Sequence, residues 1–206
     1  MSNFLVKKVA VLGAGVMGAQ IAAHCVNAKV PVILFDLPAA GDKNAIVLKA
    51  IEGLKKLNPA PLGHNDLAAL IQPANYEQHL DLLKDCDLVI EAIAERMDLK
   101  HDLYKKVTPF LASHAIFATN TSGLSITQLS EGFEGELKGR FCGVHFFNPP
   151  RYMHLAELIP TASTRPEILD QLETFLTTTL GKGVVRAKDT PNFVGNRVGI
   201  FGILAT

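Results

Sequence analysis

KVAVLGAGVMG, residues 8–18, is the stretch of sequence that decides the fold. A short β-rich apolar run leads into three glycines with GxGxxG spacing, and a helical pattern of apolar residues follows over 16–28. Gly13 permits a tight turn, Gly15 lets a pyrophosphate approach the backbone, and Gly18 lets the helix pack closely on the strand. The stretch therefore predicts a strand, a turn and a helix that bind a dinucleotide.

The residues around this turn indicate which dinucleotide binds. The amides of Val16 and Met17, at the start of the helix, are placed to attract phosphate charge. Asp36 lies 18 residues after Gly18, at the end of a second apolar run, where a carboxylate accepts hydrogen bonds from ribose hydroxyls. Leu37 follows with no arginine close by, so a 2′-phosphate would meet an unbalanced negative charge and NAD is favoured over NADP. The alternative is a glycine turn with a purely structural role.

Strand and helix patterns alternate along the rest of the chain. This order is typical of an α/β fold and predicts a Rossmann-type doubly wound, mainly parallel sheet. The expected strands cover residues 8–12, 32–35, 88–92, 115–119, 140–146, 155–159 and 183–186. The expected helices cover 16–28, a segment with Ile46, Ala50, Leu54 and Leu57 on its apolar face, 99–111, 166–180, and the residues from 194 onward.

Composition excludes several classes of protein. The chain has 206 residues, of which 48% are hydrophobic and 19% charged, with 20 Lys and Arg against 20 Asp and Glu. Such a chain buries a sizeable core and is not disordered. A net charge of zero provides none of the basic excess that nucleic acid binding requires. No stretch approaches the roughly 18 apolar residues of a membrane span, so no membrane insertion is expected.

The cysteines indicate a compartment. Cys25, Cys86 and Cys142 form no CxxC pair and would leave one thiol unpaired whichever two were joined. This usage favours a reducing, cytoplasmic setting. The pair Lys7-Lys8 and the apolar run after it are similar to a secretory signal, but the glycine spacing within that run has its own explanation.

Polar side chains follow two further strands of the predicted sheet. The segment Glu91-Ala92-Ile93-Ala94-Glu95 ends one strand, with Lys100 one turn into the next helix, and Thr119-Asn120-Thr121-Ser122 ends another. Ligands of open α/β sheets bind at this edge, so these residues are candidates for contacts with a nicotinamide or a substrate oxygen. The alternatives are a solvated pair of Glu95 with Lys100 and a helix N-cap within 119–122.

His145 is the candidate catalytic base. It ends a strand beside two phenylalanines, and Glu157 lies 12 residues later on the next strand. A hydroxyl-oxidising site needs a base; imidazole titrates near neutrality, and a carboxylate on its second nitrogen fixes the tautomer and stabilises the imidazolium. The alternative is a core histidine with satisfied hydrogen bonds. The other six histidines have no comparable setting, and their spacing forms no metal site.

DTPNFVGNR, residues 189–197, leads into the last expected helix. It places Asn196 on the first turns of that helix, where a neutral amide can hydrogen-bond a substrate carbonyl or hydroxyl. The alternatives are that Asp189 or Asn192 is a helix cap and that Asn196 and Arg197 form a solvated face. Apolar residues recur up to the end of the chain, which suggests a fragment of a longer protein.

Together these motifs resemble the NAD-binding domain of the 3-hydroxyacyl-CoA dehydrogenases of fatty-acid β-oxidation. The resemblance extends over essentially the whole chain, through GAGVMG at 13–18, FD at 35–36, EAIAE at 91–95, NTS at 120–122, HFFNP at 145–149 and DTPNFVGNR at 189–197. Gly123, Asn192 and Phe201 depart from the common pattern, in which serine, glycine and proline are usual. None of these departures removes a candidate catalytic group.

The resemblance implies an activity, the NAD-dependent oxidation of a 3-hydroxyacyl-CoA substrate to 3-ketoacyl-CoA. His145 is then the base and Glu157 its partner, while Ser122 and Asn196 orient the substrate's oxygens. The residues implied at the nicotinamide end of the cofactor are Glu95, Lys100 and Asn120.

The resemblance also implies a domain arrangement. Residues 1–190 form the NAD-binding domain, and 191–206 form the first helix of a C-terminal helical domain through which the full-length protein is a homodimer. A chain without that domain is expected to bind NAD but to be weakly active or inactive. The alternative functions are another β-hydroxyacid dehydrogenase, a class that usually relies on a lysine, or a non-catalytic NAD-binding module.

Overall fold

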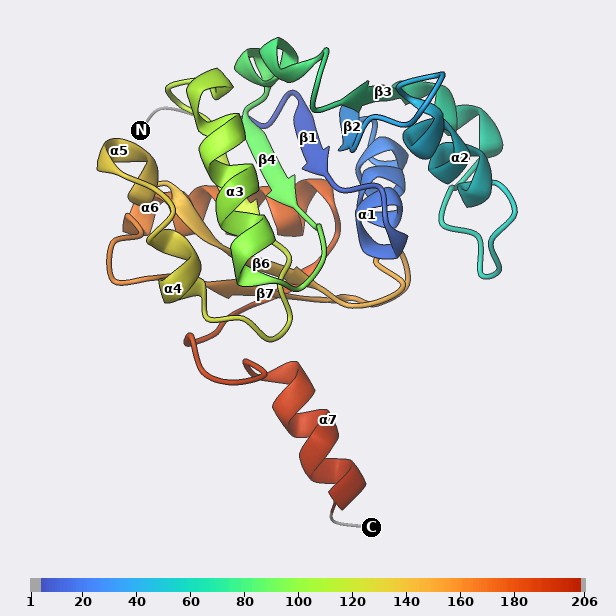
Figure 1. Ribbon diagram of the computed structural model, residues 1–206. Helices are drawn as coiled ribbons and strands as arrows, with labels where there is room; N and C mark the ends of the chain where they lie inside the picture. The colour runs from blue at the N-terminus through green and yellow to red at the C-terminus, as the bar shows by residue number, and fades with distance from the viewer. Residues whose placement is uncertain (1–4, 205–206) are drawn as a thin grey trace.

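An eight-stranded sheet forms the centre of the computed structural model, which describes residues 5–204 (Figure 1). Its strand order is β3-β2-β1-β4-β5-β6-β7-β8. The strands are β1 (Val9–Leu12), β2 (Val32–Asp36), β3 (Ile71–Asn75), β4 (Leu88–Glu91), β5 (Ile116–Thr119), β6 (Phe141–Phe146), β7 (Leu155–Ile159) and β8 (Gly183–Arg186). Strands β1 to β6 are parallel, β7 is antiparallel to β6, and β8 is parallel to β7. The predicted Rossmann-type sheet is confirmed.

Helices cover both faces of this sheet (Figure 1). They are α1 (Val16–Asn27), α2 (Ala45–Leu54), α3 (Met97–Val107), α4 (Ile126–Ser130), α5 (Gly135–Lys138), α6 (Pro166–Thr174) and α7 (Gly195–Leu204). The short segments η1 (Asn65–Leu70), η2 (Leu80–Asp85) and η3 (Thr108–Phe110) are 3-10 turns, and η4 (Phe175–Thr179) is a π-helical turn. One buried cluster joins α1, α2 and α6 to one face, and a second joins α3, α4 and α5 to the other. Strands buried on both faces are mainly apolar, which is why most of their residues form continuous apolar runs in the sequence.

Strand β3 was not expected from the sequence. Pro73 and the exposed Gln72 interrupt its apolar pattern. The strand lies at the edge of the sheet, where the missing amide hydrogen of a proline is tolerated. Its parallel pairing with β2 sets the position of the residues that follow it.

The apolar face expected for α2 was wrong in part. Ile46 and Leu57 are 40% and 47% exposed, whereas Val47, Ile51 and Leu54 are buried. Leu54 is buried as expected, whereas Leu57 lies beyond the end of the helix. Within α2, packing against the sheet rather than periodicity alone decides that Val47 and Ile51 face inward and Ile46 does not.

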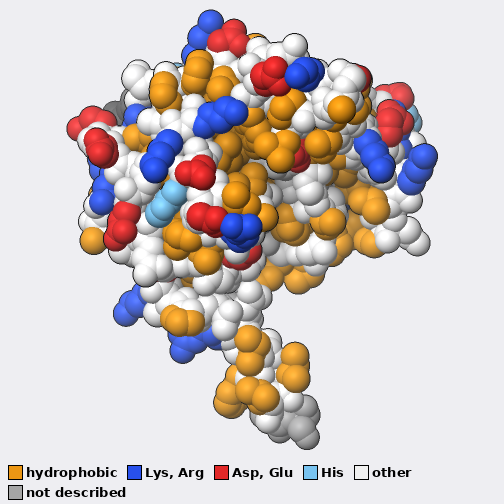
Figure 2. Space-filling model, viewed as in Figure 1, with side chains coloured by type: hydrophobic (Ala, Val, Ile, Leu, Met, Phe, Trp, Pro, Cys, Tyr) orange, Lys and Arg blue, Asp and Glu red, His pale blue; other side chains and the backbone are white. Residues whose placement is uncertain are grey.

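Helix α7 extends away from the sheet and its covering helices (Figures 1 and 2). None of its described residues is buried, and Val198, Phe201 and Leu204 are 66%, 74% and 80% exposed. Across residues 5–204, no helix has both the length and the apolar character needed to cross a membrane. The three cysteines are unbridged and buried, and burial raises the pKa of each thiol to about 12.

Candidate active site

The glycine turn between β1 and α1 has the close approaches that its sequence predicts. Gly13 has a φ of +107°, and a Cβ there would lie 2.8 Å from the carbonyl oxygen of Ala92. A Cβ on Gly18 would lie 1.8 Å from the carbonyl oxygen of Gly13, so α1 can approach the turn only with glycine at this position. A Cβ on Gly15 would meet no atom within 4 Å. The backbone at Gly15 therefore faces open space of the kind that a pyrophosphate needs.

Asp36 ends β2 beside this turn and is held by two backbone amides. Its Oδ2 accepts a hydrogen bond from the Ala14 amide at 2.6 Å, and its Oδ1 accepts one from the Leu37 amide at 2.7 Å. The remaining lone pairs of the carboxylate are available to ribose hydroxyls. Val16 and Met17 begin α1, and the first amides of a helix have no partner within it. The turn, the amides and the carboxylate fit a dinucleotide with an unphosphorylated ribose.

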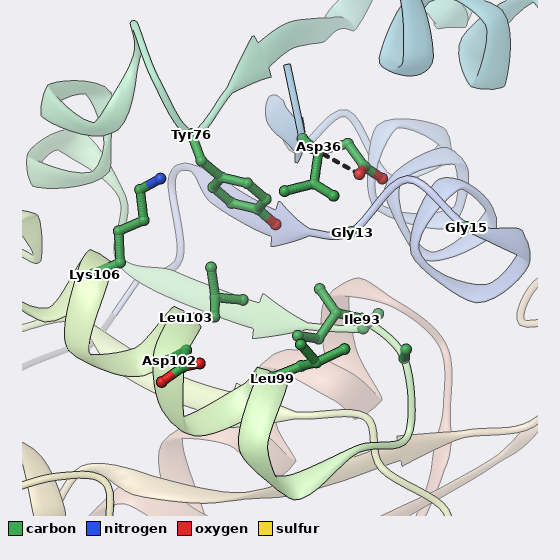
Figure 3. Close-up of a pocket in the computed structure, with 12 residues that line it drawn as sticks. Gly13, Gly15, Asp36, Tyr76, Ile93, Leu99, Asp102, Leu103 and Lys106 are labelled. Carbon is green, nitrogen blue, oxygen red and sulfur yellow. Dashed lines mark hydrogen bonds between the residues drawn. The ribbon is translucent and has the colours of Figure 1, made fainter. Parts of the chain in front are cut away.

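A cavity of about 480 Å³ lies beside Asp36 and the glycine turn (Figure 3). The side chains of Ile93, Leu99 and Leu103 form an apolar wall from the β4–α3 segment, and Tyr76 lies across from them. The remaining lining residues are Gly13, Gly15, Asp36, Leu37, Ala92, Ala94, Asp102 and Lys106. Apolar walls beside a ribose-binding carboxylate suit an adenosine. Sequence reasoning missed Tyr76 because its position depends on the unexpected strand β3.

His145 and Glu157 lie directly opposite each other on β6 and β7. Nδ1 of His145 is 2.7 Å from Oε2 of Glu157, and Nε2 of His145 is 3.0 Å from Oγ of Ser122. The rings of Phe147 and Phe193 pack against the imidazole, with centroids 4.5 and 5.6 Å away. His145 and Glu157 are buried, whereas Ser122 is exposed. The Nε2 side of the imidazole therefore faces the side of the site that a ligand can reach.

The contacts of Glu157 decide how His145 is protonated. Its Oε1 accepts hydrogen bonds from the amides of Val194 and Gly195 at 2.9 and 2.8 Å, just before and at the start of α7. A carboxylate only accepts hydrogen bonds, so Nδ1 of the imidazole carries a hydrogen. Nε2 of the neutral ring is then an acceptor, which is the arrangement that a general base requires.

Glu95 holds the segment that carries Ser122. Its Oε1 accepts hydrogen bonds from the amides of Ser122 and Gly123, both at 2.8 Å, and from the hydroxyl of Thr121. Burial alone would raise the pKa of Glu95, but the Thr121 and Gly123 hydrogen bonds and the Lys100 charge outweigh it, and the pKa is lowered. A carboxylate that stays ionised keeps this loop in place beside His145.

Lys100 is fully buried, so it is not half of a solvated pair. Its ammonium contacts Oε1 of Glu91, and Glu95 Oε2 is 3.8 Å away. Oε2 of Glu91 accepts hydrogen bonds from the hydroxyls of Tyr104 and Thr119, both at 2.8 Å. The sequence marked Glu91 as the end of a strand but did not show that it is the main partner of Lys100.

The two asparagines of the predicted site have different settings. Oδ1 of Asn120 accepts a hydrogen bond from the Phe146 amide at 2.9 Å, which ties the end of β5 to β6. Asn196 lies on the first turn of α7 and is half-buried, and within residues 5–204 no hydrogen bond joins it to His145. One alternative made Asp189 a cap of the last helix. Asp189 instead caps α4, because it accepts hydrogen bonds from Ser125 and from the first amides of that helix.

The open parallel sheet, the glycine turn and the carboxylate at the end of β2 define a dinucleotide-binding domain of the Rossmann type. A family model described as "3-hydroxyacyl-CoA dehydrogenase, NAD binding domain" matches residues 8–190, and the chain belongs to this family. The resemblance and the choice of NAD made from the sequence are thereby confirmed.

Individual relatives agree with the family model. A "Probable 3-hydroxyacyl-CoA dehydrogenase" of Deinococcus radiodurans is 48% identical over 201 residues, which are 97% of this chain and 58% of the relative. The mitochondrial hydroxyacyl-coenzyme A dehydrogenase of Sus scrofa is 38% identical, over 95% of this chain and 63% of the relative. The crystal structure of FadB2 from M. tuberculosis superposes with a TM-score of 0.84 at 30% identity, over 98% of this chain and 70% of that one. The chain thus spans less than two thirds of the length of both sequence relatives.

Proposed function

We propose that this chain is the NAD-binding part of an enzyme that oxidises 3-hydroxyacyl-CoA to 3-ketoacyl-CoA. The carrying observation is the buried His145–Glu157 pair, in which Nε2 of His145 faces the Ser122 hydroxyl near the carboxyl end of β5, on the side of the sheet where the glycine turn follows β1. The family match and the name of the Deinococcus relative support the same substrate class. A dehydrogenase that relies on lysine has less support, because Lys100 is buried against Glu91.

NAD held by the glycine turn and Asp36 would supply the hydride acceptor for C3 of the substrate. Nε2 of His145 takes the proton of the C3 hydroxyl, because the Nδ1 hydrogen is already donated to Glu157. Glu157 stabilises the imidazolium, and Ser122 and Asn196 orient the oxygens of the substrate. Glu95 and Asn120 shape the nicotinamide end of the site, and Lys100 acts there through Glu95.

The same proposal includes a domain arrangement. Residues 1–190 form the NAD-binding domain, and residues 191–206 begin a helical domain that forms a homodimer. The exposed apolar residues of α7 and the greater length of the relatives support this division. The unbridged cysteines support a reducing, cytoplasmic setting.

The test compares His145→Gln with the wild type in the longer protein of which we propose this chain is a part. Oxidation of NADH by acetoacetyl-CoA, followed by absorbance, should slow by about 10²- to 10⁴-fold, the usual contribution of general acid–base catalysis. NADH affinity, measured by fluorescence enhancement, should stay unchanged. Near-normal turnover in the variant would refute His145 as the base. In the 206-residue chain we expect NADH binding with weak turnover or none.

A further inference from the structure

Tyr76 lies against the cavity beside Asp36 in a fixed position. It directly follows β3, and its amide donates a hydrogen bond to the carbonyl oxygen of Asp36 at 3.2 Å, which continues the pairing of β3 with β2. Its ring stacks on Phe35, with centroids 5.8 Å apart and an interplanar angle of 15°. Only 4% of the residue is exposed. Backbone pairing and ring stacking therefore both hold the phenol in place.

The hydroxyl of Tyr76 is buried and has no hydrogen-bond partner among residues 5–204. The other buried tyrosine, Tyr104, donates its hydroxyl hydrogen to Glu91. Figure 3 shows the Tyr76 ring reaching into the cavity, with its oxygen directed toward the Gly13 turn. Because a buried polar group without a partner is costly and rare in native proteins, this hydroxyl points to a ligand atom.

The chemistry of the cavity shows which ligand atom this is. Burial and the negative charges of Asp36 and Glu91 raise the pKa of Tyr76 well above its usual value, and the nearby Gly13 amide, which is already bonded to the Phe35 carbonyl, only partly opposes this shift, so the phenol stays a donor. The same cavity contains the ribose-binding carboxylate and an apolar wall that suits a purine. Ribose oxygens and purine ring nitrogens are both acceptors.

We propose that the Tyr76 hydroxyl donates a hydrogen bond to the adenosine half of NAD and thereby sets part of the affinity for the cofactor. The inference rests on NAD binding at the glycine turn and adds a polar contact from β3 to it. In the ligand-free domain, the Tyr76 hydroxyl has no structural role under this proposal.

The experiment removes the hydroxyl alone, as Tyr76→Phe, and measures Kd by titration calorimetry with NAD⁺ and with AMP. Both dissociation constants should rise by the same factor, roughly 3- to 10-fold, as expected for one neutral hydrogen bond. The Tm of the ligand-free variant should equal or exceed that of the wild type, because a buried unsatisfied hydroxyl has been removed. Tyr152→Phe is the matched control, since its half-exposed hydroxyl is bonded to the Ala60 carbonyl and is not among the residues that line the cavity.

Three results would overturn the inference. Equal Kd values for NAD⁺ in wild type and variant would show that the hydroxyl contacts no cofactor atom. A weaker NAD⁺ affinity with an unchanged AMP affinity would place the contact outside the adenosine half. A lower Tm in the ligand-free Tyr76→Phe variant than in the Tyr152→Phe control would assign the hydroxyl a structural role. Absence of NAD⁺ binding by the wild type, in the same titration, would instead remove the function on which the inference rests.

Discussion

At the scale of single residues, Glu157 is held through both oxygens of its carboxylate. One of its oxygens accepts from His145, and the other accepts from the amides of Val194 and Gly195. In Glu157→Gln, the amide NH₂ faces either the two backbone N–H groups, where a donor opposes donors, or Nδ1 of the imidazole, which then accepts from the amide and carries its hydrogen on Nε2 instead. The first orientation leaves buried donors unsatisfied, and the second replaces a charge-assisted hydrogen bond by a neutral one and removes the acceptor that a base requires at Nε2.

We expect Glu157→Gln to lower the free energy of unfolding by about 1–3 kcal/mol, measured by urea denaturation. Turnover in the longer protein should fall as well, because the neutral amide no longer stabilises an imidazolium. Glu52→Gln is the control, since this carboxylate is exposed and its single ion pair with Lys55 is worth little, roughly 0–1 kcal/mol. Equal unfolding energies for the two variants would contradict the account.

His24 makes the fold sensitive to acid. Burial and the charges of Lys182 and Arg151 lower its pKa from 6.5 to about 4, although a hydrogen bond to the Leu180 carbonyl opposes the shift. Between pH 6.5 and about 4, the His24 imidazole is therefore protonated in the unfolded chain and neutral in the folded chain. The neutral His24 imidazole therefore costs the folded chain no stability above pH 6.5, and the free energy of unfolding falls as the pH drops from 6.5 toward 4.

The check on this prediction is the fall in Tm between pH 7.5 and pH 4.5. It should be smaller in His24→Gln than in the wild type, because the glutamine amide can still donate to Leu180 but does not titrate. The pKa of Lys182, lowered by burial to about 8, does not interfere, because its effect falls between pH 8 and 10.5. Parallel losses of Tm in the two proteins would show that other groups govern acid stability.

At the scale of elements, two glycines of the β1–α1 turn have opposite roles. Gly18→Ala would place a methyl group against the Gly13 carbonyl, so α1 must shift and the ligand-free Tm should fall markedly. Gly15→Ala meets no neighbouring atom, so its Tm should stay near that of the wild type while its Kd for NAD⁺ rises. Thermal melts and calorimetry separate the two effects. Intact NAD⁺ affinity in Gly15→Ala would mean that the cofactor does not approach this backbone.

The elements also show how far sequence reasoning reaches. The central strands β1, β2, β4, β5 and β6 could be predicted because burial on both faces makes them mainly apolar, with polar residues near their carboxyl ends. The edge strand β3 could not, because Pro73 is allowed only where one side of a strand is unpaired. The buried face of α2 was misjudged because adjacent sets of residues had the same period.

The candidate site likewise contains residues that could be predicted from the sequence and residues that could not. His145 and Glu157 could be paired from the sequence, because each lies on an apolar strand and consecutive strands are often neighbours. The partner of Lys100 could not be identified, because the choice between Glu91 and Glu95 depends on how α3 packs over the end of β4. Tyr76 gave no signal for a related reason, since its setting follows from the pairing of β3.

At the scale of the whole molecule, the exposed apolar side of α7 is the feature most open to experiment (Figure 2). A truncation to residues 1–197 removes Val198, Phe201 and Leu204 but retains the two amides that hold Glu157. We expect the truncated chain to bind less of the dye ANS and to self-associate less in sedimentation, because a contiguous apolar surface is lost. NAD⁺ affinity should not change. Unaltered dye binding would show that the apolar surface lies elsewhere.

The change of strand direction between β6 and β7 has a consequence for how such a protein can evolve. The contacts that we propose for the adenosine half of the cofactor come from segments that follow β1, β2, β3 and β4, whereas the histidine–glutamate pair forms where β7, running in the opposite direction, joins the parallel sheet. Mutations in β7 can therefore abolish or redirect the chemistry without altering the nucleotide site. A protein with this fold can therefore acquire a new substrate through changes in β6 and β7 while it keeps the glycine turn between β1 and α1.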